Sequence, residues 1–194
     1  MGFQTEVNGY QISLFNARNY DPNSTDNSWN FDQLYSDEEY DDYQFVTRHG
    51  IEVSLNNQRL SAALIMGGSG ATDIHIHAFV ANDNKLIVCC SNNVYCLSIP
   101  ELDLLWRVKC DEATCFQIFA YKDNFIVHGE LQITCLHQNG KQKWEFSGTD
   151  IFVTPNGKDN FQIVDGCIYV TNWDLVQVIL DADTGKVMNE GDQP

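Results

Sequence analysis

Short apolar runs, rich in β-branched and aromatic residues and bounded by Asn, Asp and Gly, recur along most of the chain. The runs are about four to six residues long, which is typical of strands and too short for a 3.6-residue helical periodicity. In the first third of the chain the pattern predicts strands over 7–15, 44–53 and 61–66, with a turn over 55–59. We therefore expect an all-β fold.

The second part of the chain repeats itself. Equivalent apolar runs occur at Leu86–Val88, Phe125–Val127 and Cys167–Val170. A tryptophan follows in the first two units, and these residues, Trp106 and Trp144, are 38 positions apart. A period near 40 residues with about four short strands per unit is typical of a propeller blade.

The turns of these units carry a recognisable motif. Asn139-Gly140-Lys141 leads to Trp144, and Leu180-Asp181 leads to Asp183-Thr184-Gly185-Lys186. Over about residues 72–187 the units resemble the blades of the quinoprotein (PQQ-like) β-propeller repeat superfamily. The resemblance implies about three four-stranded repeats, with each tryptophan packed between neighbouring blades.

Three repeats are an incomplete set, because propeller rings usually have about four to eight blades. We expect an incomplete or open propeller with an N-terminal β-rich region. Three alternatives stay open: a fourth blade from residues before Gly67, an open stack of sheets, or closure through another chain.

A glycine-rich break, Gly67-Gly68-Ser69-Gly70, separates two regions. The N-terminal region spans 1–70 and the repeat region spans 71–194, and we expect them to form one compact domain together. The break lacks the lysine of a phosphate-binding loop, so we interpret it as a flexible connection.

The segment 21–43 has eight carboxylates, five aromatic residues and no Lys or Arg. We expect a loop or a short helix near 30–40 whose rings pack on the body while the acids face water. Carboxylates at this density resemble a phosphate backbone, and rings act as anchors in interfaces. The candidate partner-binding residues are Trp29, Asp32, Tyr35, Asp37, Glu38, Glu39, Tyr40, Asp41 and Asp42. The alternative is a solvated lid.

The chain is strongly acidic, with a net charge of −16. Such a surface repels nucleic acid and anionic membranes and favours a partner with a basic surface. The seven cysteines are odd in number and lie mostly in apolar runs, which predicts reduced thiols packed in the core, including Cys89 and Cys90. With no secretory leader pattern at the start and no apolar run of about 20 residues, we expect a cytoplasmic protein.

The best metal candidate is the pair His75 and His77. On a strand these side chains would share one face with Asp73, and His49 or His128 would have to complete a zinc site. The alternative is a solvated or hydrogen-bonded strand face. Asp181 and Asp183 faintly resemble a calcium loop, but the spacing is that of an ordinary hairpin turn. We expect no cofactor.

No nucleophile elbow, catalytic triad or pair of carboxylates in apolar surroundings is evident, so we expect no enzymatic activity. The first hypothesis is a non-catalytic protein-binding module, in its sharpest form an immunity-type protein that neutralises a basic toxin. The second is a sheet scaffold for a small molecule or metal. The third is a structural or assembly protein in which incomplete blades pair between chains as a homo-oligomer.

Overall fold

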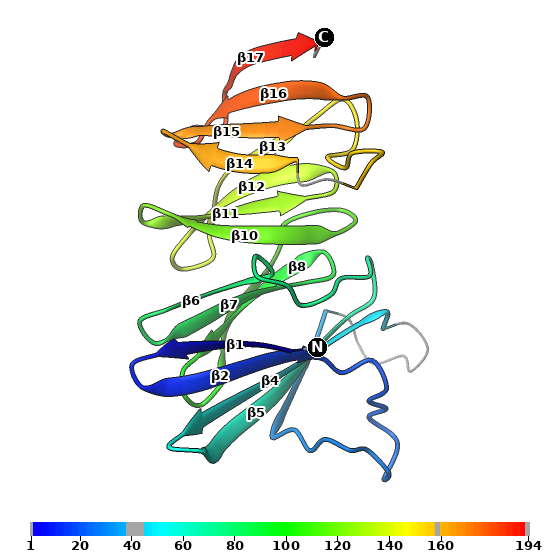
Figure 1. Cartoon of the computed structure of the whole chain (residues 1–194), viewed down its shortest axis with the longest axis vertical. Coiled ribbons are helices and arrows are strands. Elements are labelled where there is room, and N and C mark those ends of the chain that lie inside the picture. The colour runs from blue at the N-terminus through cyan, green and yellow to red at the C-terminus, as the bar shows by residue number, and fades with distance from the viewer. Residues whose placement is uncertain (1, 38–44, 158–159, 193–194) are drawn as a thin grey trace.

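The computed structural model describes residues 2–37, 45–157 and 160–192, and these residues form strands joined by turns and loops. Four sheets, which we name A to D in chain order, are stacked along the long axis of the molecule (Figure 1). The described residues contain no helix, and so none that would be long and apolar enough to cross a bilayer. The prediction of an all-β fold is confirmed.

Sheet A contains five strands in the order β1-β2-β4-β5-β3. Its strands are β1 (Gly2–Val7), β2 (Tyr10–Asn16), β3 (Gln33–Ser36), β4 (Thr47–Leu55) and β5 (Gln58–Gly67). The strand β3 pairs in parallel with β5, and the other neighbours are antiparallel. The N-terminal region therefore supplies a fourth sheet, which packs on sheet B. The sequence left the existence of this sheet open, because the repeat pattern is poor before Gly67.

Two local predictions for sheet A need correction. Residues 10–15 of the strand expected over 7–15 belong to β2, but Asn8 and Gly9 form a tight hairpin turn with φ of 52° and 84°, so Val7 belongs to the preceding strand β1. The loop or helix expected near 30–40 contains the strand β3 instead. Its pairing partner lies about 30 residues further along the chain, which local pattern cannot detect.

Sheets B, C and D each contain four antiparallel strands in chain order. Sheet B consists of β6 (Phe79–Asn82), β7 (Lys85–Cys90), β8 (Asn93–Ser98) and β9 (Leu104–Lys109). Sheet C consists of β10 (Cys115–Tyr121), β11 (Asn124–Gly129), β12 (Gln132–His137) and β13 (Gln142–Ser147). Sheet D consists of β14 (Phe161–Val164), β15 (Cys167–Thr171), β16 (Val176–Asp181) and β17 (Val187–Asp192). The predicted four-stranded repeats are confirmed.

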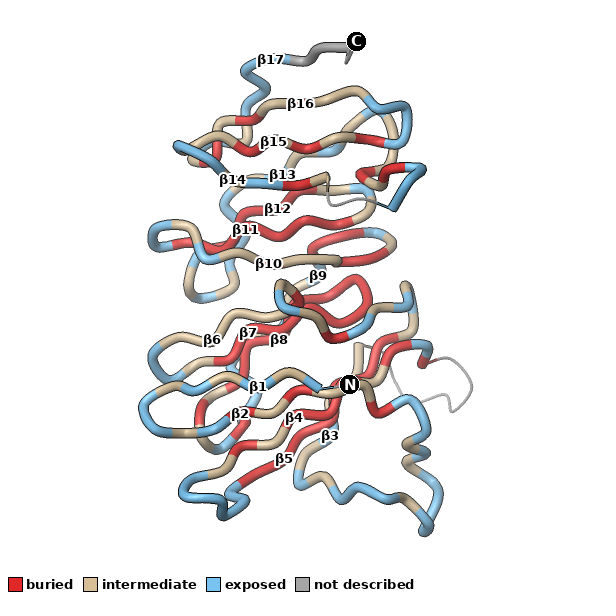
Figure 2. Tube along the Cα trace, in the orientation of Figure 1, coloured by how far each residue is buried: buried red, intermediate tan, exposed pale blue. Residues whose placement is uncertain are grey.

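Apolar layers separate the sheets, since alternate residues of each inner strand point to opposite faces. Leu86 and Val88 pack toward sheet A, whereas Ile87 and Cys89 of the same strand pack toward sheet C. A further layer lies between sheets C and D. Buried residues accordingly run through the middle of the stack, and exposed residues gather at its turns (Figure 2).

The repeated tryptophans lie between sheets, as the resemblance implied. A Cβ added at Gly140 would lie 2.6 Å from the Trp106 ring, and one added at Gly185 would lie 2.5 Å from the Trp144 ring. Each ring of one sheet thus covers a glycine in the last hairpin turn of the next. A flat ring over a residue without a side chain lets adjacent sheets approach closely.

Sheet D differs from sheets B and C on its outer face. In sheet B the cross-strand row facing sheet C is Val80, Ile87, Cys96 and Trp106. In sheet C the equivalent row facing sheet D is Phe119, Ile126, Cys135 and Trp144. In sheet D the same row is Gln162, Tyr169, Ile179 and Asn189. Polar residues at both ends of this row, in place of Phe and Trp, are typical of a repeat that caps a stack.

The long connections lie at one rim of the stack, on the right in Figure 1, and the short hairpins β1–β2, β6–β7 and β10–β11 lie at the opposite rim. The described parts of these connections include residues 17–32, 68–78, 110–114 and 148–157. The cavities described below open at the long-connection rim.

Candidate functional site

The loop between β2 and β3 folds over the outer face of sheet A, the face turned away from sheet B. Phe15 lies over Gly50, where a Cβ would be 2.4 Å from the ring. Trp29 stacks on Phe15 with ring centroids 4.2 Å apart, and Phe31 lies 6.3 Å from Phe15. Tyr20 meets Phe31 edge-on at 5.0 Å. The rings of the acidic–aromatic segment that fall in this loop therefore pack on the body.

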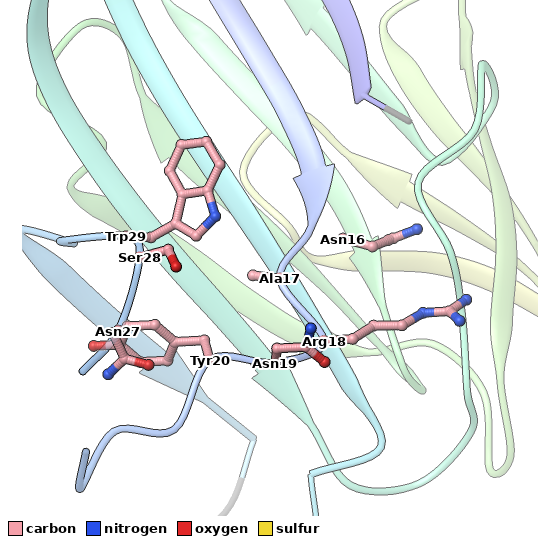
Figure 3. A pocket seen from close by; sticks show the side chains of 8 residues that line it. All are labelled: Asn16, Ala17, Arg18, Asn19, Tyr20, Asn27, Ser28 and Trp29. Carbon is pink, nitrogen blue, oxygen red and sulfur yellow. The ribbon is translucent and has the colours of Figure 1, made fainter. Parts of the chain in front are cut away.

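Trp29 is nevertheless 47% exposed. Because one side of its ring packs on Phe15, the side chain is held in place while the rest of the indole faces water. Beside it lies a cavity of about 330 Å³ (Figure 3). The cavity is lined by Asn16, Ala17, Arg18, Asn19, Tyr20, Asn27, Ser28 and Trp29.

Hydrogen bonds within the loop fix its shape. The Asn27 side chain accepts from the Asp21 N–H at 3.0 Å and donates to the carbonyl oxygens of Asp21 and Ser24 at 2.6 and 3.0 Å. Asp21 Oδ1 accepts from the Asn23 N–H at 2.9 Å. Asp21 and Asp26 remain exposed, so the loop presents carboxylates near a fixed aromatic ring.

The predicted partner-binding residues have different environments. Trp29 and Asp32 lie at the surface, and Asp32 pairs with Arg59 at 3.0 Å. The Tyr35 hydroxyl donates to the Leu102 carbonyl at 2.9 Å and accepts from Leu104, so this ring joins sheet A to sheet B.

The rest of the predicted set is either tied to the fold or not described. Asp37 Oδ2 accepts from the Gly68 N–H at 3.1 Å, and its Oδ1 is buried. Glu38, Glu39, Tyr40, Asp41 and Asp42 lie outside the described residues.

A second cavity, of about 320 Å³, adjoins the first and shares Asn16 and Arg18 with it. It also contains Arg48, which lies on β4, the strand that pairs with β2. Arg18 Nη2 contacts both carboxylate oxygens of Asp73 at 2.5 and 2.6 Å. Arg48 has no such ion pair among the described residues, and its Nε is buried without a hydrogen-bond partner. Arg18 and Arg48 therefore both line this cavity, and Asp73 neutralises Arg18.

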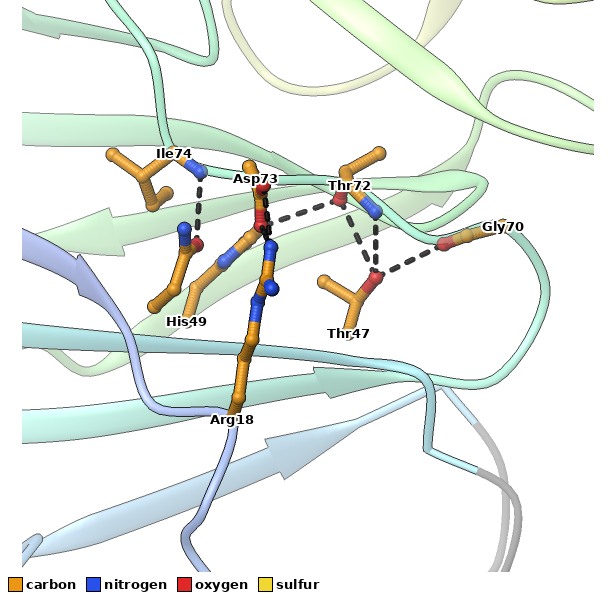
Figure 4. Close-up of polar contacts among 8 residues, drawn as sticks. Arg18, Thr47, His49, Gly70, Thr72, Asp73 and Ile74 are labelled. Atoms are coloured by element: carbon orange, nitrogen blue, oxygen red, sulfur yellow. Dashed lines mark hydrogen bonds and ion pairs between the residues drawn. The ribbon is translucent and has the colours of Figure 1, made fainter. Parts of the chain in front are cut away.

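Side chains of sheet A hold the loop that carries Asp73 (Figure 4). Asn16 Oδ1 accepts from the Ile74 N–H at 2.9 Å. Thr47 Oγ1 donates to the Gly70 carbonyl at 3.0 Å and accepts from the Thr72 N–H at 2.9 Å. The backbone on both sides of Asp73, which forms one wall of the cavity, is therefore held in place by these hydrogen bonds.

His49 lies beneath this wall and is fully buried. Its Nε2 is 3.2 Å from Thr72 Oγ1, and its Nδ1 has no hydrogen-bond partner. Burial lowers the pKa of His49 to about 4, although the nearby carboxylate of Asp73 opposes the shift. The ring is therefore neutral at pH 7.

The expected placement of His75 and His77 on a strand was wrong, since both lie in the connection between β5 and β6. His75 Nε2 donates to the Phe116 carbonyl at 2.9 Å, and Nδ1 accepts from the His77 N–H at 3.2 Å. The His77 ring packs against Phe119 at 5.0 Å. With both nitrogens so bonded, His75 offers no lone pair to a metal. In the described part of the chain, no group of three or more His, Cys, Asp or Glu side chains is placed to hold a metal ion.

Six of the seven cysteines are buried and all are free thiols, as predicted, with Cys167 half-buried. Cys89 and Cys90 point to opposite faces of β7 and pack in different apolar layers. Burial raises the pKa of both thiols well above the ordinary value, which keeps them protonated and unreactive.

Sequence reasoning missed the two arginines. Arg18 and Arg48 are 30 positions apart and neither belongs to a motif. The only signal was their scarcity, because the chain has 11 basic residues in all. Both line one cavity because Asn16 pairs with His49 across β2 and β4, a pairing that no local pattern predicts.

Comparison with known proteins gives no family and no curated relative: no family model matches the chain, and no curated protein matches it. Solved structures do match. The structure of the "AfRom2 CNH domain" is 10% identical with a TM-score of 0.55, over 99% of this chain and 54% of that one. BamB from Moraxella catarrhalis is 14% identical with a TM-score of 0.50, over 74% of this chain and 46% of that one.

A third match, the Pan2 WD40 domain of Neurospora crassa, has a TM-score of 0.48 and 14% identity, over 60% of this chain and 38% of that one. This chain spans about half, or less, of the length of these structures. At such low identity the similarity concerns the fold alone, and the fold is that of a β-propeller with its four sheets left open.

Proposed function

We propose that this protein is a non-catalytic protein-binding module that uses its acidic surface to bind a partner with a basic surface. The observation that carries the proposal is Trp29, an exposed ring held in place by Phe15 in the same loop as the exposed Asp21, Asp26 and Asp32. A rigid, half-exposed tryptophan is a frequent centre of binding energy, because little entropy is lost when it is covered.

The charge of the molecule supports the same kind of partner. Only four described cations form ion pairs: Arg18, Arg59, Lys109 and Lys122. Most exposed carboxylates therefore have no positive neighbour, and a basic protein would be attracted over about a Debye length. The specific partner that we propose is a basic toxin neutralised by an immunity-type protein, with the carboxylates standing in for phosphates.

Two further proposals accompany this function. We place the protein in the reducing cytoplasm, which six buried free cysteines support. We also assign the repeats to the quinoprotein (PQQ-like) superfamily as an incomplete set of blades, supported by Gly140 and Gly185 under Trp106 and Trp144. The metal-scaffold and assembly hypotheses gain no specific observation, because His75 is bonded through both nitrogens and sheet D has polar residues on its outer face.

The test compares Trp29→Ala with Trp173→Ala. Both tryptophans are 47% exposed, but Trp173 lies in the turn between β15 and β16 of sheet D. A partner recovered from the source organism and identified by mass spectrometry would be titrated against each purified variant by calorimetry. We expect Trp29→Ala to weaken binding at least about tenfold and Trp173→Ala to leave it unchanged.

Salt provides the second arm of this test. Because the attraction is between exposed charges, we expect the association rate to fall steeply between about 0.05 and 0.3 M sodium chloride. Recovery of no basic protein, equal affinities of the two variants, or an association rate indifferent to salt would contradict the proposed function.

A further inference from the structure

We propose that Asn27 is the positioning residue of the binding surface around Trp29. Its side-chain amide closes the loop between β2 and β3 on itself, so that the exposed carboxylates of the loop and the Trp29 ring meet a basic partner in one fixed arrangement. This inference rests on the proposed function, to which it adds the residue that determines the shape of the surface. Asn27 itself is half-buried and acts through its neighbours.

The two ends of the loop are each attached to sheet A by hydrogen bonds. At the first end, the Tyr20 N–H donates to the carbonyl of Ala17, directly after β2, at 2.9 Å. At the second end, the Asp32 N–H donates to the Ala62 carbonyl at 2.8 Å, and Asp32 Oδ2 accepts from the Ala62 N–H at 2.7 Å. Within the described part of the chain, no hydrogen bond or ion pair joins residues 21–28 to a strand of sheet A. The middle of the loop is therefore held by its own contacts.

The Asn27 amide closes this middle part. Its Oδ1 accepts from the Asp21 N–H at 3.0 Å, and its Nδ2 donates to the carbonyls of Asp21 and Ser24 at 2.6 and 3.0 Å. An amide has two N–H donors and one carbonyl oxygen, and here all of them are used. The other hydrogen bonds within the segment 21–27 span two or three residues, whereas those between Asn27 and Asp21 span six. Asn27 is therefore the residue that joins the two ends of the segment.

The closed segment keeps carboxylates beside Trp29. Asp26 directly precedes Asn27, Asp21 is bonded to Asn27, and both aspartates are exposed. Trp29 follows two residues after Asn27, so the ring and the two carboxylates keep fixed relative positions. In Figure 3 the Arg18 guanidinium points away from Trp29 and Asn27, so its positive charge is directed elsewhere.

Removing the Asn27 side chain would free the middle of the loop without detaching its ends. Residues that become mobile must be ordered again when a partner binds, and the conformational entropy lost in that step lowers the affinity. In the parent protein, folding has already ordered these residues. Asn27 thus contributes to affinity and to the choice of partner, because carboxylates at fixed positions match only some arrangements of cations.

The first experiment compares the parent protein with Asn27→Ala by ¹⁵N relaxation and needs no partner. We expect the heteronuclear NOE of residues 21–27 and of the Trp29 indole N–H to fall in the variant, because motion on the picosecond-to-nanosecond timescale increases. The amides of β4 should keep their values, since both ends of the loop stay attached. The matched control is Asn23→Ala, which should behave like the parent. Asn23 is an exposed residue of the same segment, and its side chain makes no hydrogen bond within the described chain.

The second experiment titrates the basic protein recovered above against the same variants by calorimetry and stopped-flow fluorescence. We expect Asn27→Ala to bind about tenfold more weakly, with a less favourable entropy and faster dissociation, and Asn23→Ala to bind like the parent. The dependence of the association rate on sodium chloride should stay that of the parent, because Asn27→Ala changes no charge.

A third variant, Asn27→Asp, separates positioning from charge. It keeps Oδ1 but places a second oxygen where the donor faced the carbonyls of Asp21 and Ser24, and it adds a negative charge to an acidic surface. If charge alone decided the affinity, the basic protein would bind Asn27→Asp more tightly than the parent. We expect it to bind more weakly, because the loop is no longer closed.

Three results would overturn this inference and leave the proposed function intact. They are unchanged relaxation of residues 21–27 in Asn27→Ala, parent-like affinity of Asn27→Ala for a protein that Trp29→Ala binds weakly, and tighter binding of Asn27→Asp. Equal affinities of Trp29→Ala and Trp173→Ala would instead contradict the proposed function, and the role of Asn27 in binding would fail with it.

Discussion

Asp111 is almost fully buried, and its carboxylate accepts four backbone hydrogen bonds. Oδ1 accepts from Ala113 and Thr114 in the connection from sheet B to sheet C, and Oδ2 accepts from Leu131 and Gln132 in sheet C, both at 2.8 Å. A single side chain thus satisfies the backbone where one sheet leads into the next. Gly129 permits this approach, since a Cβ there would lie 2.2 Å from Oδ2.

Asp111→Asn should destabilise the protein by about 2–4 kcal/mol, because an amide has one oxygen and would turn its NH₂ group toward two backbone donors. The measurement is the free energy of unfolding in urea. Asp123→Asn, at an exposed hairpin turn, is the control and should change stability by less than about 0.5 kcal/mol. Similar losses in the two variants would show that the hydrogen bonds of Asp111 do not matter for stability.

His49 makes stability depend on pH. Its pKa is about 4 in the folded protein, because burial disfavours the charged ring, and about 6.5 when unfolded. Between these values the unfolded chain binds more protons, so stability is complete above pH 6.5 and falls as the pH drops toward 4. The contribution is about 3 kcal/mol.

The check is urea unfolding of the parent protein and of His49→Gln at several pH values from about 7 to about 4.5. Glutamine does not titrate, so the variant should lose less stability over this interval than the parent. Parallel curves for the two proteins would refute the assignment of this pH dependence to His49.

At the scale of elements, the last hairpins of sheets C and D are each shaped for the tryptophan ring of the sheet before. Gly140 combines a φ of 79° with a Trp106 ring 2.6 Å from the position of a Cβ. Gly9 has a φ of 84° and nothing within 4 Å of that position. Alanine substitutions at these two glycines therefore distinguish the cost of a left-handed backbone from the cost of a steric clash with the ring.

Gly140→Ala should lose about 2–4 kcal/mol of unfolding free energy, against about 1–2 kcal/mol for Gly9→Ala, which pays only for the left-handed conformation. Thermal unfolding of both variants measures the difference. If Gly140→Ala were no worse than Gly9→Ala, the ring would not be holding the sheets together.

At the scale of the whole molecule, the two end faces differ from the faces between sheets. The loop that contains Trp29 covers part of the outer face of sheet A, and the rest has polar residues such as Gln11, Ser13 and Glu52. The outer row of sheet D has Gln162 and Asn189 where the inner rows have apolar residues. Polar ends keep stacked sheets from associating with further copies.

Restoring the apolar row by Gln162→Val and Asn189→Trp should therefore make the protein self-associate, whereas the parent chain should remain a monomer. Sedimentation velocity over a range of concentrations distinguishes the two outcomes. Glu145→Trp, which adds an equal ring at an exposed position of β13, is the control and should stay monomeric. Oligomers of the parent chain would favour the assembly hypothesis instead.

The sequence by itself determined the all-β class and the repeated four-stranded units, because alternation, turn residues and the 38-residue spacing of Trp106 and Trp144 are local or periodic signals. It also determined that most cysteines are buried, because residues in the apolar runs of inner strands pack in the core. The same signals indicated that rings of the acidic–aromatic segment pack on the body, as Trp29 and Phe31 do.

Only the tertiary structure decided that the N-terminal region forms a sheet with β3 parallel to β5, that His75 lies in a connection, and that Arg18 and Arg48 line the same cavity. Each of these depends on pairing between segments about 30 residues apart or on the packing of one sheet against another. The hydrophobic effect is non-directional, so an apolar pattern states which residues are buried. Which polar groups then become neighbours depends on strand register and on the course of the long connections.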